Sequence, residues 1–157
     1  MTPEYVRELL DYNPATGVFT WRVLHSNMRS GQVAGNVSRY RTIKINRKHY
    51  LAHRLAWFVA FGAWPPNQID HINGVRDDNR LVNLRLATQS ENNANAKTPK
   101  NKTGFKGVAP HRKKWCARIR VNGRKRHLGL FDTPEAAYQR YCEVAREVYG
   151  EFGEPRR

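Results

Sequence analysis

The spacing of apolar residues changes from one segment of the chain to the next, and each spacing predicts an element. Behind Thr2 and Pro3 the apolar residues predict a helix over 3–11, because threonine can cap a helix and proline is tolerated in its first turn. The patterns up to residue 61 predict further elements: strands over 18–23, 41–45 and 48–51, and a buried helix over 53–61. The first part of the chain is therefore expected to mix strands with helices.

After two consecutive prolines the chain contains two short apolar stretches and one helix signal. The stretch 68–71 predicts a strand, and 81–86 is a second apolar stretch beyond an intervening turn. Thr88 and Glu91 have the spacing of a capping box, which predicts a helix over 90–97. A strand, a loop and a returning helix are therefore expected to follow one another in this window.

Beyond residue 103 the apolar residues alternate strictly with polar ones. Every second residue over 115–121 is apolar, which predicts a strand with one buried face. Asn122-Gly123 is a strong hairpin signal, so a returning strand is expected after it. Thr133 followed by proline predicts the start of an amphipathic helix. The segment 104–153 is therefore expected to form a three-stranded antiparallel sheet packed on one helix.

These elements predict an α+β protein of two modules. The first spans 1–97 and includes a β-rich N-terminal extension. The polar, proline-containing segment 98–103 is a linker. The second module is the sheet and helix of 104–153.

The charge balance points to a polyanionic partner. The 157 residues include 28 Lys and Arg against 13 Asp and Glu, a formal net charge of +15, and nucleic acid is the usual partner of such an excess. No acidic residue lies between Asp11 and Asp70, nor between Lys97 and Arg126, so two basic stretches flank an acidic cluster over 70–78. This arrangement suits a metal-dependent enzyme that acts on a phosphate backbone.

Several other classes of protein are excluded on composition. No apolar run approaches the ~18 residues of a membrane span, and the start of the chain lacks the apolar core of a secretory signal. Cys116 and Cys142 are too few for a zinc cage made only of cysteines or for a disulfide framework. The expected protein is cytoplasmic and has no membrane partner.

The acidic cluster carries the candidate chemistry. Asp70 and His71 are adjacent near a strand end, Asn83 follows His71 by twelve residues, and Asn92 follows Asn83 by nine. The returning helix would bring Asn92 back toward Asp70. Carboxylate and amide oxygens can hold a divalent ion while a neutral imidazole takes a proton from water.

This spacing resembles the HNH nuclease motif in its Asp-His…Asn…Asn form, over residues 50–97. The segment from His53 to Trp57 also resembles HNH proteins of phages and homing elements. The resemblance implies a ββα-metal core at about 66–97, two strands and a helix around one metal ion. His53 itself is better explained as a hydrogen-bonded core histidine than as a ligand, because it begins a buried helix.

The resemblance also implies a role for each motif residue. His71 is the general base, and Asp70 and Asn92 are the metal ligands. Asn83 is assigned to the catalytic set because it fixes the loop geometry and orients the base. Neighbouring Asn93 and Asn95 are alternatives to Asn92 as the ligand. Oxygen ligands favour Mg²⁺ or Mn²⁺ over Zn²⁺, and no structural zinc is expected because no cysteine pairs flank the site.

The C-terminal segment 104–152 resembles the AP2 DNA-binding domain, in which a three-stranded sheet lies in the major groove and is backed by a helix. Alternation independently places Arg118 and Arg120 on the face away from the helix, although a solvated basic face is the alternative. The basic residues expected to contact DNA are Lys106, Arg112, Lys114, Arg118, Arg120, Lys125 and His127.

The function predicted from the sequence is that of a metal-dependent, site-specific endonuclease of double-stranded DNA. A phage or mobile element in a bacterial host is the expected source. A monomer with one catalytic centre would nick DNA, and a homodimer could cut both strands. Two alternatives remain. One is a non-catalytic sequence-specific DNA-binding regulator with a decayed HNH module, and the other is a protein that binds or cleaves RNA.

Overall fold

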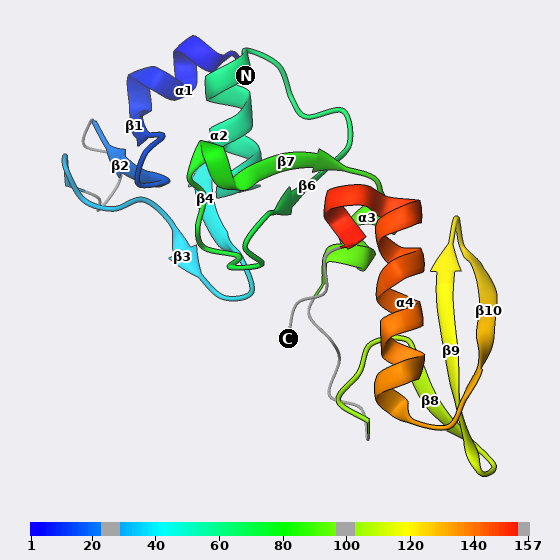
Figure 1. The fold of residues 1–157 in the computed structure, drawn as a ribbon. Helices are drawn as coiled ribbons and strands as arrows, with labels where there is room; N and C mark the ends of the chain where they lie inside the picture. The colour runs from blue at the N-terminus through cyan, green and yellow to red at the C-terminus, as the bar shows by residue number, and fades with distance from the viewer. Residues whose placement is uncertain (23–28, 97–102, 154–157) are drawn as a thin grey trace. The chain divides into compact units, whose positions relative to one another are not determined.

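The computed structural model describes residues 1–22, 29–96 and 103–153 (Figure 1). The chain divides into two compact units, Met1–Leu86 and Ala87–Arg157, and both mix helices with strands. The boundary lies earlier than the predicted segment 98–103, of which residues 98–102 are outside the described residues. The helix predicted over 90–97 therefore belongs to the second unit.

In the described residues, the first unit combines helices with three small sheets, and the strands of the first two are antiparallel. Its elements, in chain order, are α1 (Pro3–Leu9), β1 (Leu10–Asn13), β2 (Val18–Trp21), β3 (Asn36–Val37), β4 (Arg41–Ile45), β5 (Lys48–Leu51), α2 (Ala52–Phe61), β6 (Gln68–His71), the 3₁₀ helix η1 (Leu81–Asn83) and β7 (Leu84–Ala87). The strands pair as β1-β2, β3-β4-β5 and β6-β7. Asp70 and His71 are the last residues of β6, and Asn83 ends η1 directly before β7.

The first helix is shorter than predicted. Thr2 caps it as expected, with Tyr5 N donating to Thr2 Oγ1 at 3.3 Å. The helix ends at Leu9, and the next residues form β1, which pairs antiparallel with β2 so that Leu10 lies opposite Trp21. The local pattern suits a helix, but pairing with β2 across the turn decides the conformation.

Residues with positive φ mark two element boundaries in the middle of this unit. Asn46 and Arg47 have φ of 49° and 64° and close the β4-β5 hairpin. Gly62, with φ of 77°, ends α2 in the left-handed conformation. The apolar stretch 81–86 is divided between η1 and β7 rather than forming one element.

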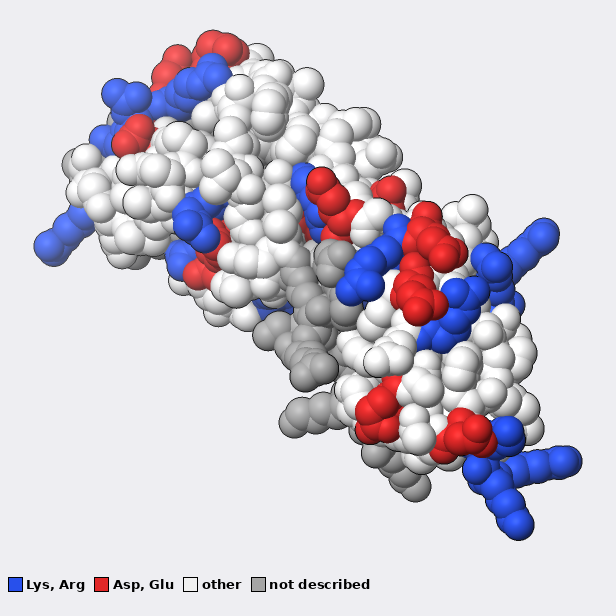
Figure 2. Space-filling model, in the orientation of Figure 1, with Lys and Arg blue, Asp and Glu red and all other residues white. Residues whose placement is uncertain are grey.

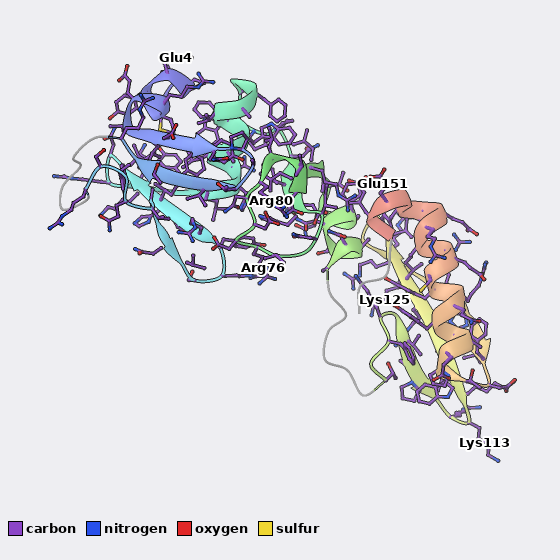
Figure 3. The ribbon with its side chains drawn as sticks, turned by 60° about the vertical axis from the view of Figure 1, so that its left-hand side comes forward. Glu4, Arg76, Arg80, Lys113, Lys125 and Glu151 are labelled. Atoms are coloured by element: carbon purple, nitrogen blue, oxygen red, sulfur yellow. The ribbon has the colours of Figure 1, made fainter. Side chains whose placement is uncertain are left out.

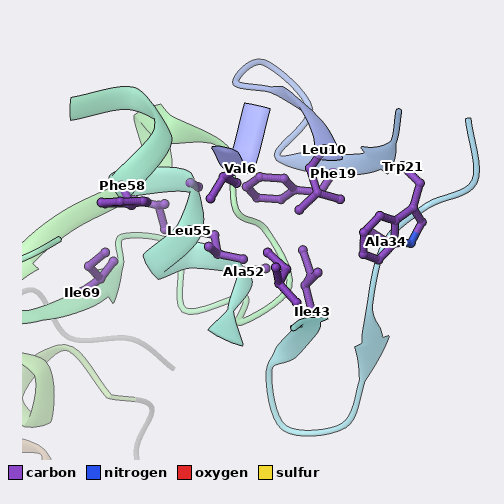
Figure 4. Close-up of a cluster of buried hydrophobic side chains, with 13 residues drawn as sticks. Val6, Leu10, Phe19, Trp21, Ala34, Ile43, Ala52, Leu55, Phe58 and Ile69 are labelled. Carbon is purple, nitrogen blue, oxygen red and sulfur yellow. The ribbon is translucent and has the colours of Figure 1, made fainter. Parts of the chain in front are cut away.

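The core of the first unit joins elements from its whole length (Figure 4). Val6 of α1, Phe19 of β2, Ile43 of β4 and Leu55 of α2 are all fully buried. Ile69 of β6 belongs to the same cluster, so the residue just before the candidate site is anchored in this core.

The second unit begins with a short helix and continues as a sheet backed by a long helix. Its elements are α3 (Gln89–Asn95), β8 (Val108–His111), β9 (Lys114–Val121), β10 (Arg124–Phe131), α4 (Pro134–Tyr149) and the 3₁₀ helix η2 (Gly150–Gly153). The strands are antiparallel in the order β10-β9-β8. Thr88 and Glu91 form the predicted capping box of α3, and Thr133 caps α4.

The second unit has its own core between the sheet and α4. Ala117 and Ile119 of β9 are buried with Ala137, Tyr141 and other residues of α4. Gly107 is fixed by this packing, because it has φ of +74° and an added Cβ would lie 2.2 Å from the Tyr141 ring. None of the helices in the described ranges combines the length and apolarity that crossing a membrane requires.

Candidate active site

Asp70 and His71 are the last two residues of β6, and both side chains are buried, with 4% and 5% of their surface exposed. Arg85 of the neighbouring strand β7 donates from Nε to Asp70 Oδ2 at 3.0 Å. A buried carboxylate needs such a partner, because an unpaired buried charge is costly. Sequence reasoning missed Arg85, although a single arginine between two leucines of a short buried strand is a signal for such pairing.

The imidazole of His71 is oriented by Asn79, whose exposed fraction is 1%. His71 Nε2 lies 3.3 Å from Asn79 Oδ1, and Asn79 Nδ2 donates to the carbonyl of Asp77. Since Asn79 presents its oxygen, a neutral His71 donates from Nε2 and keeps Nδ1 as its basic nitrogen. Sequence reasoning missed this contact as well.

The electrostatic surroundings keep His71 neutral. Burial is the largest influence and lowers its pKa from 6.5. The hydrogen bond with Asn79 and the charges of Asp70 and Asp78 act in the opposite direction but do not outweigh burial. A neutral imidazole at pH 7 can accept a proton from water.

Asn83 connects the two ends of the loop that follows β6. Its Oδ1 accepts from Asn73 N at 2.9 Å, and its Nδ2 donates to the Asp78 carbonyl at 2.7 Å. Its own carbonyl accepts from Ile72 N at 2.8 Å. These contacts fit the predicted role of Asn83 in fixing the loop. Asn83 would influence the orientation of His71 through the loop.

Two ion pairs hold the same loop. Arg80 donates to both carboxylate oxygens of Asp78, at 2.8 and 2.6 Å, and these hydrogen bonds lower the pKa of Asp78 to about 2. Arg41 of β4 donates from Nε and Nη2 to the two oxygens of Asp77, both at 2.9 Å. The loop after β6 is therefore held by one ion pair within the loop and by a second ion pair to strand β4.

A second buried histidine lies beside His71. The His53 ring centroid is 5.0 Å from that of His71 in an edge-to-face arrangement, and 5.2 Å from that of Tyr40. Burial lowers the pKa of His53 to about 3, so it is neutral. Its Nδ1 has no hydrogen-bond partner in the described part of the chain, which differs from the hydrogen-bonded core histidine that the sequence predicted.

Asn92 lies on α3, in the second unit, while Asp70 lies in the first. Its pairing with Asp70 as a metal ligand stays a prediction. The described residues contain no group of three or more His, Cys, Asp and Glu that could hold a metal ion. The predicted ligands are one carboxylate and one amide, and this oxygen donor set fits a hard divalent ion without such a group.

On the second unit, four of the predicted DNA contacts share one face of the sheet. Arg118 and Arg120 of β9 are exposed, while Ala117 and Ile119 are buried and Val121 is half-buried. In the β9-β10 register, His127 lies opposite Arg118 and Lys125 lies opposite Arg120. Directly opposed residues of antiparallel strands point to the same side, so these four side chains form a basic row.

Three other predicted contacts lie around this sheet. Arg112 is in the β8-β9 turn with φ of 54°, next to Lys113, which projects from the unit (Figure 3). Lys114 pairs with the exposed Asp132 at 3.1 Å. Figure 2 shows lysine and arginine side chains extending from this unit into solvent.

Lys106 is engaged within the protein. Its ammonium donates to three main-chain carbonyls at the end of α3, those of Asn93, Ala94 and Ala96, at 2.7 to 2.8 Å. An ammonium has three donors, and cations stabilise helix C-termini. The predicted contact with DNA would require that the ammonium leave these carbonyls.

Comparison with known proteins identifies the family. The family model of HNH endonucleases matches residues 50–94, which include Asp70, His71, Asn83 and Asn92. The chain is 36% identical over 104 residues to Protein 3.8 of Escherichia phage T7, covering 64% of this chain and 85% of that protein. It is 33% identical over 105 residues to an uncharacterized HNH endonuclease of Acanthamoeba polyphaga mimivirus, covering 66% of this chain and 55% of that protein. No solved structure matches the chain. The chain therefore contains an HNH endonuclease domain over residues 50–94 and is a DNA nuclease.

Proposed function

We propose that this protein is a metal-dependent, site-specific endonuclease that cuts double-stranded DNA with His71 as its general base. The observation that carries the proposal is the buried Asp70–His71 pair, in which Asn79 orients a neutral imidazole. A base of this kind must be unprotonated near pH 7 and must present a defined nitrogen. Both conditions follow from the surroundings of His71.

Asp70 and Asn92 are the residues that would hold the divalent ion, either Mg²⁺ or Mn²⁺. When bound, such an ion neutralises charge on the phosphate and stabilises the leaving oxygen. His71 then removes a proton from the attacking water through Nδ1. Asn83 keeps the loop after β6 in place, because it bonds to both ends of that loop. Arg85 holds the Asp70 carboxylate in a fixed orientation.

The second unit would supply affinity and position on DNA, as its AP2-like sequence implies. The row of Arg118, Arg120, Lys125 and His127 is exposed, its two arginines and its lysine are cationic, and arginine can read guanine in the major groove. Arg112 and Lys114 at the sheet margin are suited to phosphate contacts. One catalytic centre handles one strand at a time, so a monomer of the protein nicks duplex DNA.

The proposal is tested by incubating supercoiled plasmid and phage DNA with the full chain in Mg²⁺, Mn²⁺ or EDTA. Conversion to nicked circles is expected with either metal and not in EDTA. His71→Ala should abolish it, while His49→Ala, a histidine on the surface of the same unit, should retain it. Cleavage that persists in EDTA or in His71→Ala would refute the mechanism. Tight DNA binding without cleavage by the wild type would favour a regulator.

A further inference from the structure

Two arginines from distant parts of the first unit converge on one aromatic ring. The guanidinium carbon of Arg76 lies 5.3 Å from the centroid of the Tyr40 ring, and that of Arg39 lies 5.9 Å from it. Arg39 and Tyr40 lie between β3 and β4, whereas Arg76 lies in the loop after β6 (Figure 3). Both arginines are exposed, and the ring is half-buried between them and the protein. At these distances the ring quadrupole attracts both cations.

The same ring lies against the proposed general base. The Tyr40 and His71 rings are stacked, with centroids 6.1 Å apart and an interplanar angle of 29°. His53 contacts both rings and completes a cluster of three. The charge of Arg76 acts on His71 and is among the influences that lower its pKa. The ring that holds the two guanidinium groups is therefore also the ring that stacks on the residue that would activate water.

These two arginines differ from their neighbours in having no carboxylate partner. Arg41, Arg80 and Arg85 pair with Asp77, Asp78 and Asp70, respectively. Within the described ranges, no ion pair joins Arg39 or Arg76 to an acidic residue. Their positive charge is left uncompensated, which favours an anion at this place.

The two loops that carry the arginines are fastened to each other. Arg41 follows Tyr40 directly, Asp77 follows Arg76 directly, and the two form a bidentate ion pair with both distances at 2.9 Å. Backbone positions one or two residues away from this ion pair have little freedom to separate. The arrangement of Arg39, Tyr40 and Arg76 is thus built before any ligand arrives, which lowers the entropic cost of binding.

We propose that Arg39 and Arg76 bind the phosphodiester group of the DNA strand that is cut, and that Tyr40 is the positioning residue that holds them beside His71. The inference rests on the proposed nuclease function and assigns the substrate contacts of the same site. The planar guanidinium groups donate hydrogen bonds to the non-bridging phosphate oxygens and offset the negative charge that grows there during attack. No proton or electron pair passes through either arginine.

The test measures single-turnover cleavage of a labelled duplex by full-length variants. Arg39→Ala and Arg76→Ala should each lower the rate constant by about 10²-fold, the typical effect of losing one charge-stabilising donor. Arg29→Ala, an exposed arginine elsewhere on this unit, is the matched control and should stay at the wild-type rate. Tyr40→Phe keeps the ring and should retain the rate, whereas Tyr40→Leu should lose it. Arg76→Lys should restore only part of the activity, because lysine lacks the planar fork.

A binding measurement separates this inference from the proposed function. In EDTA, NMR signals of the arginine side-chain Nε–H groups are followed while a short duplex is added. Shifts at Arg39 and Arg76 but not at Arg29 would support the phosphate contact even if the wild type proved unable to cut. Wild-type rates in the Arg39→Ala/Arg76→Ala double variant would overturn the inference while leaving the nuclease function intact. DNA binding that leaves both arginine signals unmoved would also overturn it.

Discussion

Arg85 and Asp70 form a buried ion pair between β7 and β6, with 3.0 Å between Arg85 Nε and Asp70 Oδ2. Their side chains are 15% and 5% exposed, so neither charge is well solvated. Replacing Arg85 by leucine leaves the carboxylate buried without its partner. We expect a loss of about 3 kcal/mol in the free energy of unfolding, measured by urea denaturation.

The control for this variant is an ion pair on the surface. Arg140 and Glu143 are partly exposed on α4, at 40% and 56%, and Arg140→Leu should cost less than about 1 kcal/mol. An Arg85→Leu protein as stable as Arg140→Leu would show that the Asp70 carboxylate is solvated.

Stability of the first unit should fall in mild acid. Burial lowers the folded-state pKa of His53 from 6.5 to about 3, so the unfolded chain takes up a proton at higher pH than the folded one. The stabilisation is complete above pH 6.5 and is lost as the pH falls toward 3, with a slope of up to about 1.4 kcal/mol per pH unit. Urea unfolding at a series of pH values measures it. His53→Gln should flatten part of this slope, and an unchanged slope would contradict the assignment.

Asn79 should control the pH dependence of cleavage. Asn79→Asp places a carboxylate against His71 Nε2, which favours the imidazolium and moves the acidic limb of the pH–rate profile to higher pH. Tyr12→Phe is a matched control, because Tyr12 donates to the Asn79 carbonyl at 2.8 Å without touching its side-chain amide. The Tyr12→Phe variant should have a free energy of unfolding lower by about 1 kcal/mol and an unchanged pH–rate profile. Equal profiles for all three proteins would mean that another group is the base.

Lys106 and Arg120 should differ in their effect on DNA binding. Lys106→Met removes a cation that caps α3, so we expect lower thermal stability with nearly unchanged DNA affinity. Arg120→Ala should weaken binding and, where it meets a phosphate, reduce the slope of log affinity against log salt by about 1. Fluorescence anisotropy at several salt concentrations measures the DNA affinity of each variant and its dependence on salt. A larger loss of DNA affinity in Lys106→Met than in Arg120→Ala would show that Lys106 contacts the DNA.

Features that depend on neighbouring residues were predictable from the sequence. The capping box of Thr88 and Glu91 and the Asn122-Gly123 hairpin are formed as expected, because their geometry is decided within a few residues. The segment that holds Asp70 and His71 could be recognised from the sequence, because its motif resembles that of the HNH family, whose model matches residues 50–94.

Features that depend on distant contacts were not predictable. Leu10 and Asp11 of β1 were assigned to the preceding helix, because only pairing with β2 makes them part of a strand. The roles of Arg85 and Asn79 follow from which buried group lies opposite them in space. For Lys106, a basic residue in a basic segment does not reveal whether its ammonium meets a phosphate or a carbonyl.

The two separate cores have a consequence for how such a gene can change. Among the described residues, no buried residue of one core belongs to the other, so recombination near Leu86 would leave the packing within each core intact. Such an exchange would bring in a new sheet and, under the DNA-binding role proposed for that sheet, a new preference for DNA. Because α3 follows the junction, the incoming part would also bring its own counterpart of Asn92. Under the role proposed for Asn92, active hybrids are restricted to donors that carry a compatible residue there, so the DNA preference and the predicted metal ligand would be inherited together.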